Sequence, residues 1–216
     1  MYIKLLILAL SASLVASDIR RPCALSDYNC IGRVLAANSN CNPRVVGSVP
    51  SSYTVSKYHF HAPHFNASYI DYNLVIKNHN LCKVSEFFLN LSSNTAVLAL
   101  DCPQLVFSST RETIQHRSLQ EDTRFSYNYH GTYPLIRLTT NLHASNGLNL
   151  CTSFNFADVV ALPKFRINPN DRKTANYLSR DLTLLNVFER ETFFWRAPLL
   201  TRYFINSLLC NFGCNY

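Results

Sequence analysis

Glycine is scarce in this 216-residue chain, with five residues, and methionine and tryptophan occur once each. So few glycines, with no short period between them, exclude collagen-like and other fibrous repeats. Charged residues make up 15% and hydrophobic residues 48% of the chain, which is typical of a globular protein rather than a disordered one. No stretch reaches the roughly 18 consecutive apolar residues that predict a membrane-spanning helix.

The motifs of common catalytic sites are also missing. There is no G-x-S-x-G nucleophile elbow, and the scattered glycines form no phosphate-binding loop. An even number of cysteines argues against a free thiol nucleophile. The acidic pairs at 121–122 and at 189 and 191 do not share a helix face, so we interpret them as solvated surface. The sequence therefore predicts no catalytic site and no cofactor.

One histidine cluster is a candidate for metal binding. His59, His61 and His64 lie close together in the sequence, and His59 and His61 would share one face of a strand. Imidazoles in this arrangement can hold zinc or copper. No carboxylate accompanies them nearby, so we favour a polar strand face and predict no metal site.

The net charge is positive but dispersed. Lys and Arg number 20 against 13 Asp and Glu, a formal charge of +7, yet no basic run exceeds two residues. Nucleic-acid-binding proteins concentrate such charge in a stripe. The charge is better explained by solubility or by attraction to acidic protein surfaces, and we predict no nucleic-acid partner.

The N-terminus predicts export. Lys4 precedes an apolar run at 5–10, and Val15 and Ser17 fit the −3 and −1 positions of a signal-peptidase site. The apolar run is too short to span a bilayer, although an uncleaved anchor is the alternative. We therefore predict a signal peptide over residues 1–17 and a secreted protein with no membrane association.

The cysteines agree with an oxidising compartment. All eight follow the predicted signal peptide, and neither of the close pairs has zinc-finger spacing. The sequence predicts up to four disulfides and favours a local bridge between Cys23 and Cys30, while it leaves the other pairings open. The predicted disulfide cysteines are Cys23, Cys30, Cys41, Cys82, Cys102, Cys151, Cys210 and Cys214.

Two N-x-S sequons become meaningful in a secreted chain. Asn66 and Asn90 are each followed two residues later by serine, without an intervening proline. We predict that at least one carries a glycan.

The centre of the chain has the period of strands. The 12 Tyr and 14 Phe favour strands, and apolar and polar residues alternate at 70–76, 124–129, 135–142 and 148–156. In the first of these, Ile70 and Leu74 are expected on one face and Asp71 on the other. The segments 129–133 and 146–147 are predicted turns because each contains glycine beside polar residues.

Helices are expected at the two ends. Asp27 can begin a short helix with an apolar stripe through residue 35, and Asp171 can cap a helix at 174–179. Apolar residues then recur at helical spacing over 184–195, and Pro198 is expected to begin a second run. The predicted fold class is α+β, with a long curled antiparallel sheet packed on C-terminal helices. No linker divides residues 18–216, which we predict to be a single disulfide-bonded domain.

Several longer stretches of the sequence are distinctive. They are RPC at 21–23, DYNCI at 27–31, LAANSNC at 35–41, FNASY at 65–69, VSEFF at 84–88, YPLIRLTT at 133–140, INPND at 167–171 and LCNFGCNY at 209–216. Together they resemble the fibrohexamerin family, a silk glycoprotein family of moths and butterflies. The resemblance covers essentially the whole chain after the signal peptide and includes all eight cysteines.

The resemblance implies a non-catalytic role. Members associate non-covalently with the fibroin heavy and light chains and aid their solubility, transport and secretion, in the manner of a chaperone. Asn66 matches a family sequon. The family's second sequon, before the YPLI stretch, is absent here because 128–132 reads NYHGT, which leaves Asn90 as the second candidate.

A weaker similarity is to the insect juvenile-hormone-binding and takeout proteins. It consists of an early cysteine pair, long strands and an apolar C-terminal helix with tryptophan. This resemblance implies strands curled around a helix with an enclosed lipid tunnel. The alternative function is therefore a secreted carrier of an apolar ligand.

Overall fold

The computed structural model describes residues 18–43, 47–143, 148–179 and 182–214. The predicted signal peptide at 1–17 and the predicted turn at 146–147 lie outside these ranges. The elements in chain order are β1 (Ile19–Arg20), α1 (Tyr28–Ala37), β2 (Ser52–Ala62), η1 (Pro63–Phe65), β3 (Ala67–Lys77), η2 (His79–Leu81), β4 (Lys83–Asn90), β5 (Thr95–Gln115), β6 (Thr123–His143), β7 (Phe154–Val159), β8 (Lys164–Pro169), α2 (Arg172–Leu178) and α3 (Leu182–Leu208).

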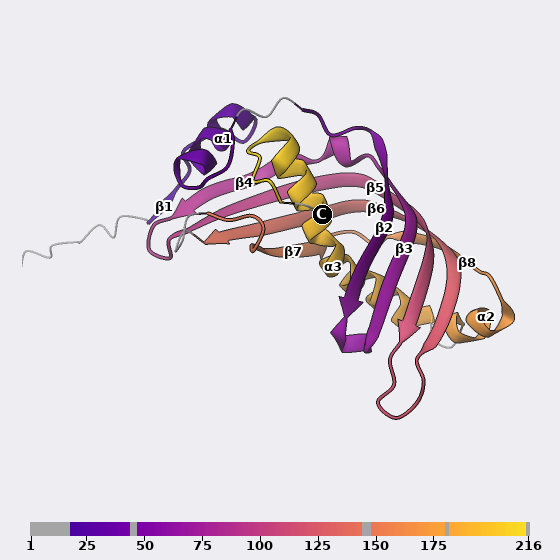
Figure 1. The fold of residues 1–216 in the computed structure, drawn as a ribbon. Helices are drawn as coiled ribbons and strands as arrows, with labels where there is room; N and C mark the ends of the chain where they lie inside the picture. The colour runs from indigo at the N-terminus through magenta and orange to yellow at the C-terminus, as the bar shows by residue number, and fades with distance from the viewer. Residues whose placement is uncertain (1–17, 44–46, 144–147, 180–181, 215–216) are drawn as a thin grey trace, which may run out of the picture.

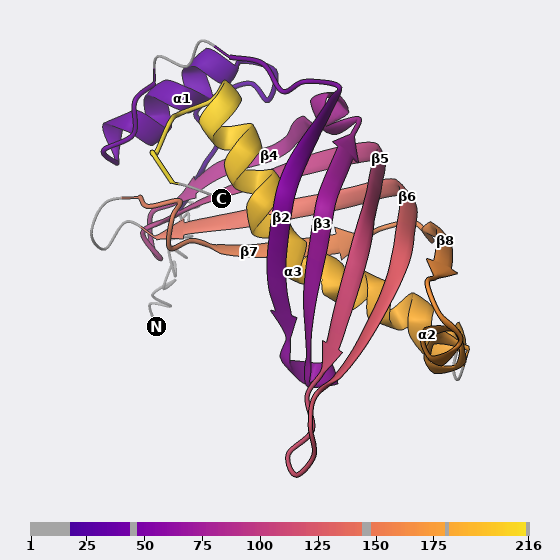
Figure 2. The same ribbon diagram turned by 45° about the vertical axis from the view of Figure 1, so that its right-hand side comes forward.

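Two very long strands organise the sheet. β5 and β6 have 21 residues each and pair antiparallel along nearly their whole length. β4 and β3 follow one another along the other edge of β5, and β7 and β8 follow one another along the other edge of β6. The sheet curls around α3, which runs along its concave side (Figures 1 and 2). Strand alternation therefore divides residues into those facing the helix and those facing outward.

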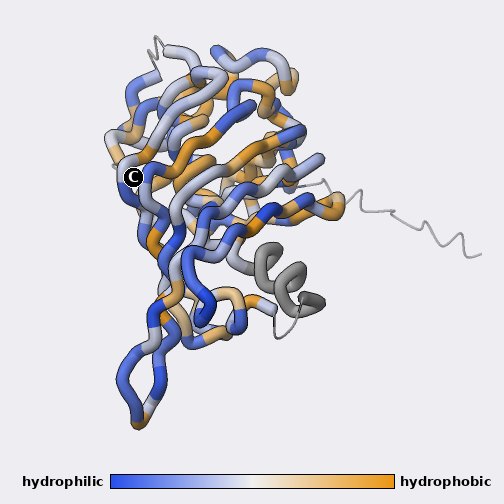
Figure 3. The backbone as a smooth tube through the Cα atoms, turned by 90° about the vertical axis from the view of Figure 1, so that its right-hand side faces the viewer, coloured by the Kyte–Doolittle hydropathy of each residue, from blue (hydrophilic) through white to orange (hydrophobic). Residues whose placement is uncertain are grey.

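The alternation predicted for β6 is confirmed. Apolar colours alternate with polar ones along the strands (Figure 3), and the inward residues are almost fully buried because they face α3 and neighbouring strands. These inward residues are Phe125, Tyr127, Tyr129, Ile136, Leu138, Thr140 and Leu142.

β3 departs from its predicted facing. Tyr72 pairs with Thr110 and Val75 with Ser108, so β3 holds one residue more than β5 between these pairs. Asn73 occupies this β-bulge with a positive φ of 51°, a conformation that asparagine tolerates. The bulge reverses the alternation, so Ile70 and Leu74 do not share a face. Asp71, predicted to lie on the face opposite Leu74, instead shares the inward face with it and is fully buried.

The predicted turn at 129–133 is wrong, because β6 continues through it. Tyr129 and Tyr133 both point inward, and their hydroxyls are 2.6 Å apart. A Cβ on Gly131 would overlap the Tyr129 hydroxyl and lie 3.1 Å from the Tyr133 ring. Glycine therefore stands here because two tyrosine side chains cover it, and not because the chain turns.

Both predicted helix caps are present. The Asp27 carboxylate accepts a hydrogen bond from the Cys30 amide at 2.9 Å at the start of α1, and Asp171 accepts from the Thr174 amide at 2.7 Å at the start of α2. Pro198, predicted to begin a separate helix, instead lies inside α3. Proline removes one hydrogen bond from a helix interior. Here the loss is offset by burial of neighbouring α3 residues, among them Ala197 and Leu200. Within the described ranges, no helix combines the length and the apolar character of a membrane span.

The contact between α1 and the end of α3 leaves no room for a side chain at Gly32. A Cβ there would overlap the carbonyl oxygen of Leu209, while Ile31 and Leu35 of the same helix are fully buried. The substitution Gly32→Ala is therefore expected to lower the free energy of unfolding by about 1–3 kcal/mol, although alanine favours an unconstrained helix by about 1 kcal/mol. Urea unfolding with the disulfides intact measures the change. Arg33→Ala on the exposed side is the control, and a Gly32→Ala protein as stable as the control would contradict this packing.

Candidate functional site

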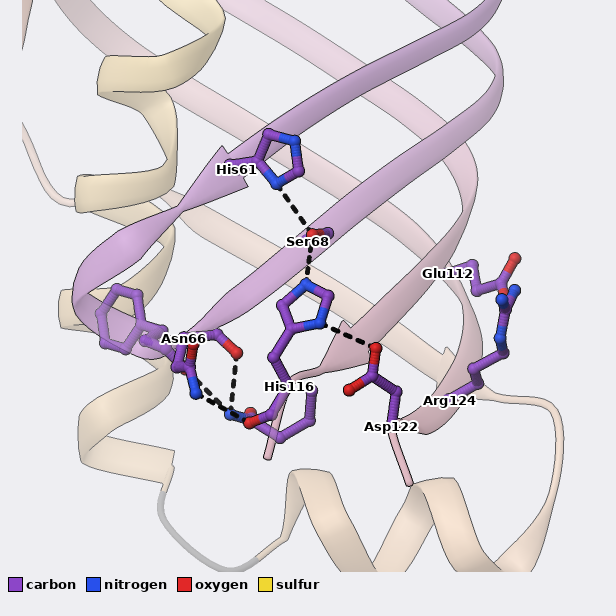
Figure 4. A network of polar contacts seen from close by, with 9 residues as sticks. His61, Asn66, Ser68, Glu112, His116, Asp122 and Arg124 are labelled. Atoms are coloured by element: carbon purple, nitrogen blue, oxygen red, sulfur yellow. Dashed lines mark hydrogen bonds and ion pairs between the residues drawn. The ribbon is translucent and has the colours of Figure 1, made fainter. Parts of the chain in front are cut away.

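A chain of polar side chains joins β2, β3 and the end of β5 on the outer surface (Figure 4). The short helix η1 reverses the chain between β2 and β3, which places His61 opposite Ser68 in the strand register. The His116 amide donates to the Asn66 carbonyl at 2.8 Å and extends the pairing of β3 with β5 by one further contact. The connection from β5 to β6 then brings Asp122 back beside His116.

The contacts form a continuous relay. Ser68 Oγ lies 2.9 Å from His61 Nδ1 and 2.5 Å from His116 Nε2, and His116 Nδ1 lies 2.9 Å from Asp122 Oδ2. An ionised carboxylate only accepts hydrogen bonds, so His116 donates from Nδ1 and, as a neutral imidazole, accepts a hydrogen bond from the Ser68 hydroxyl at Nε2. His61 Nδ1 then donates to Ser68 Oγ. This assignment gives each of the three contacts one donor and one acceptor.

Ser68, His116 and Asp122 have the order of contacts found in serine hydrolases. Such a triad needs a nucleophile that a substrate carbonyl can reach. Ser68 is only 2% exposed, because it lies in the middle of three paired strands with two imidazoles against its hydroxyl. The geometry polarises the hydroxyl but gives a substrate no access, so the relay joins strand ends rather than presenting a nucleophile. Sequence reasoning missed it because 48 residues separate Ser68 from His116.

The sequon at Asn66 lies within this network. Asn66 is exposed and follows η1 with a positive φ of 48°. Its side-chain nitrogen donates to the His116 carbonyl at 2.9 Å. An amide nitrogen carries two protons, so a glycan would replace one and leave the other for this hydrogen bond. Glycosylation at Asn66 stays a prediction, and its surroundings are compatible with it.

The second sequon lies at the hairpin between β4 and β5. Asn90 Oδ1 accepts from the Ser92 amide at 3.1 Å, from the Ser92 hydroxyl at 2.7 Å and from the Ser93 amide at 3.3 Å. These contacts use the amide oxygen and direct the amide nitrogen away from the turn. Glycosylation at Asn90 likewise stays a prediction.

The histidines singled out in the sequence do not converge on one point. His59 and His61 share the outer face of β2, with ring centroids 4.5 Å apart. Burial, with the charges of His61 and Lys57, lowers the pKa of His59. His64 is exposed in η1. Among the described residues, no group of three or more His, Cys, Asp or Glu side chains is placed to hold a metal ion.

The eight cysteines form four disulfides: Cys23–Cys30, Cys41–Cys210, Cys82–Cys102 and Cys151–Cys214. The first is the local pairing that the sequence favours. The second and fourth connect the segment after α3 to the segment after α1 and to the segment before β7. These two links join segments that lie 169 and 63 residues apart in the sequence, which restricts the unfolded chain.

An apolar strip lies at β7. The segment 148–156 was predicted as one strand, but a turn at 150–153 precedes β7 and shifts the alternation. Phe154 and Phe156 are therefore 52% and 42% exposed, and both rings contact Phe194 of α3 at centroid distances of 5.7 and 6.2 Å. Val160 and Leu162 in the connection that follows are 53% and 69% exposed. We call these five residues the β7 apolar strip.

Comparison with known proteins gives concordant results for sequence and fold. The sequence profile of the family described as Fibroin P25 matches residues 19–214. Fibrohexamerin of Galleria mellonella is 55% identical over 216 residues, which cover 98% of this chain and 99% of the relative. The crystal structure of Takeout 1 from Epiphyas postvittana superposes with a TM-score of 0.52 at 10% identity, covering 86% of this chain and 92% of that chain.

These findings confirm two predictions made from the sequence. The fold class is a curled antiparallel sheet packed on a C-terminal helix, and the likeness to Takeout 1 is a likeness of fold alone. The predicted resemblance to a silk protein family is confirmed over nearly the full chain. This chain belongs to the Fibroin P25, or fibrohexamerin, family.

Proposed function

We propose that this protein is a non-catalytic component of silk that associates non-covalently with the fibroin heavy and light chains. It is exported through a signal peptide at residues 1–17 into the silk-gland lumen, and residues 18–216 act as one domain. In this role it keeps its large partners soluble during transport and secretion. Family membership supports this function.

The disulfide arrangement is the observation that carries the non-covalent part of the proposal. All eight cysteines lie in the described part of the chain, and each is bonded to another cysteine of the same chain. No thiol is therefore left to link the protein to a partner by a disulfide. Any stable association of this folded form must rest on surface contacts.

The β7 apolar strip is the surface that we assign to the fibroin contact. Among the described strands β7 pairs only with β6, and Phe154 and Phe156 stay partly exposed although α3 packs against β7. Exposed apolar patches and open strand edges are typical of association sites. Silk chains rich in strand-forming repeats offer matching strands, and covering them with a glycoprotein would limit their self-association.

The proposal predicts how the complex dissociates and which residues hold it. Denaturant without reductant is expected to release the protein from the fibroin chains, as seen on a non-reducing gel. The double substitution Phe154→Ser, Phe156→Ser is expected to weaken capture of fibroin from gland lumen by tenfold or more, because each buried phenylalanine contributes about 1.5–3 kcal/mol. Leu119→Ser, at a side chain 97% exposed in the β5–β6 connection, is the matched control.

Two results would contradict this proposal. A complex that resists denaturant until reductant is added would show a covalent link. Equal loss of capture in the Phe154→Ser, Phe156→Ser and Leu119→Ser proteins would remove the β7 apolar strip from the contact.

The interior favours this function over a carrier of apolar ligands. Phe193, Leu200 and Phe204 of α3 are fully buried against the sheet. Arg111 and Asp71 form an ion pair within the same interior. Pockets for apolar ligands are lined mainly by apolar side chains, with few polar groups. Lipid extracted in a one-to-one ratio with the purified protein would support the carrier function instead.

A further inference from the structure

We infer that the pocket between α2 and the β5–β6 connection binds a carboxylate-bearing segment of a partner protein. The inference rests on the proposed function for the identity of that partner. The pocket has a volume of about 590 Å³ and is lined by Arg117, Thr123, Phe125, Arg172, Lys173, Asn176 and Tyr177. We call it the α2 pocket. It contains three cationic side chains and no acidic one.

The cations of the α2 pocket are not neutralised by the protein. Within the described ranges, none of Arg117, Arg172 and Lys173 makes an ion pair. Arg117 donates only to the neutral Gln120 amide, at 2.8 Å. Lys173 lies with its nitrogen 5.6 Å from the centre of the Phe125 ring.

Two acidic groups of the neighbouring segments are engaged elsewhere, and Glu121 of the β5–β6 connection is exposed and does not line the pocket. Asp122 contacts His116 in the relay. Both carboxylate oxygens of Asp171 accept hydrogen bonds from Thr174, at 2.7 and 2.9 Å, and these bonds hold the pKa of Asp171 below its usual value. Asp171 reduces the positive potential of the adjacent Lys173, while the charges of Arg117 and Arg172 are not paired with it. An acidic ligand therefore meets a net positive pocket.

The apolar wall distinguishes this site from a simple patch of charge. Phe125 and Tyr177 stack with ring centroids 3.8 Å apart and planes at 8°, and the Tyr177 hydroxyl is fixed by donation to Gln115 Oε1 at 3.0 Å. The partly exposed Tyr177 ring, held flat by the buried Phe125 ring behind it, presents a rigid apolar surface for hydrocarbon groups beside the carboxylate. Arginine side chains match carboxylates with paired donors.

The arrangement of the three cationic side chains favours an acidic peptide over a long polyanion as the ligand. The three cations surround one pocket, whereas extended polyanions are bound along a stripe of basic residues. A pocket of this volume suits one or two acidic side chains with adjacent apolar groups. α2 and the β5–β6 connection lie at the same end of the molecule (Figures 1 and 2), so a partner segment can reach both.

The test uses the full disulfide-bonded protein and fluorescent peptides. An Asp/Glu-containing peptide with flanking apolar residues is compared with the same peptide in which Asn and Gln replace the acids, by anisotropy at low and at high salt. We expect the acidic peptide to bind and the amide peptide to bind at least tenfold more weakly. Arg117→Gln and Arg172→Gln are each expected to weaken binding about two- to fivefold, and the double variant on the order of tenfold.

The controls separate this inference from simpler explanations. Arg33→Gln removes the same charge from the exposed side of α1. This variant is expected to bind the acidic peptide with an affinity within twofold of the wild-type value. Equal binding of both peptides, or equal loss with Arg33→Gln and Arg172→Gln, would overturn the inference. Tighter binding of a sulfated oligosaccharide through the same arginines would overturn the peptide assignment.

Capture of fibroin by the same variants distinguishes the two proposals. Loss of peptide binding with fibroin capture retained would leave the proposed function intact and show that the α2 pocket serves another acidic partner. Failure of the wild-type protein to capture fibroin, with peptide binding intact, would contradict the proposed function alone.

Discussion

Replacing Asp71 with alanine is expected to lower the free energy of unfolding by about 3–5 kcal/mol, the largest effect of any single substitution considered for this fold. Asp71 and Arg111 are both fully buried. Arg111 donates from Nε to Asp71 Oδ1 at 2.7 Å and from Nη2 to Oδ2 at 3.0 Å, and the Ser109 hydroxyl donates to Oδ1 at 2.8 Å. Removing the carboxylate leaves a buried guanidinium charge without its counterion.

The surroundings of Asp71 increase the expected cost. The guanidinium carbons of Arg111 and Arg196 lie 4.0 and 5.3 Å from the centre of the same Tyr129 ring. Burial raises the pKa of Asp71. The charges of Arg111 and Arg196 and the hydrogen bonds from Arg111 and Ser109 lower this pKa by a larger amount, so the net shift is downward. The carboxylate therefore stabilises the fold above the ordinary pKa of 3.8 and loses this effect as the pH falls through its lowered value.

A surface pair with the same geometry provides the control. Arg137 donates to Asp101 at 2.7 and 2.8 Å, but their side chains are 50% and 30% exposed. Asp101→Ala is expected to cost at most about 1 kcal/mol. The double variant Asp71→Leu, Arg111→Met should recover a large part of the loss, because it removes both charges of the pair. Urea unfolding at neutral pH, without reductant, measures all three. Equal costs for Asp71→Ala and Asp101→Ala would contradict a buried, charge-dependent role.

Asp71 also shows where sequence reasoning fails. An aspartate between apolar residues of an alternating strand is normally solvent-facing, and only the bulge at Asn73 turns it inward. The bulge depends on pairing with β5, more than 30 residues away, as the Tyr72–Thr110 pair shows. Arg111 is buried beside Asp71 because the two residues are opposite each other in the β3–β5 register. Long-range pairing of this kind leaves no local pattern to read.

Sequence patterns predicted correctly those features that depend on contacts between residues close together in the chain. The Asp27 and Asp171 caps depend on contacts three residues along the chain, and strand alternation in β6 is a direct consequence of the pleat. Gly131 misled because glycine favours turns and close approaches alike. The Ser68–His116–Asp122 relay and the α2 pocket combine residues from separate elements, so composition and spacing carry no sign of either.

Acidification from pH 6.5 to pH 4 is expected to remove about 3 kcal/mol of stability through His79 alone. His79 of η2 is fully buried, against Tyr53, Tyr203 and Phe204. Burial lowers the pKa of His79 from 6.5 to about 4. Between these values the unfolded chain binds a proton at this imidazole and the folded chain does not. Stability is therefore unaffected by His79 above pH 6.5, falls as the pH decreases through this window, and levels off near pH 4.

The measurement is the slope of unfolding free energy against pH, which separates titration from packing. His79→Phe is expected to flatten the slope between pH 6.5 and pH 4, whatever its own stability at pH 7. The His79→Phe protein also lacks the 2.8 Å contact between the Tyr53 hydroxyl and His79 Nδ1. Its absolute stability is therefore not the quantity compared. His64→Gln, at an exposed position, should retain the wild-type slope. The pKa of Asp71 lies below its ordinary value of 3.8, so the stability that Asp71 contributes is lost below the range from pH 6.5 to pH 4. An unchanged slope in His79→Phe would show that other groups carry the acid sensitivity.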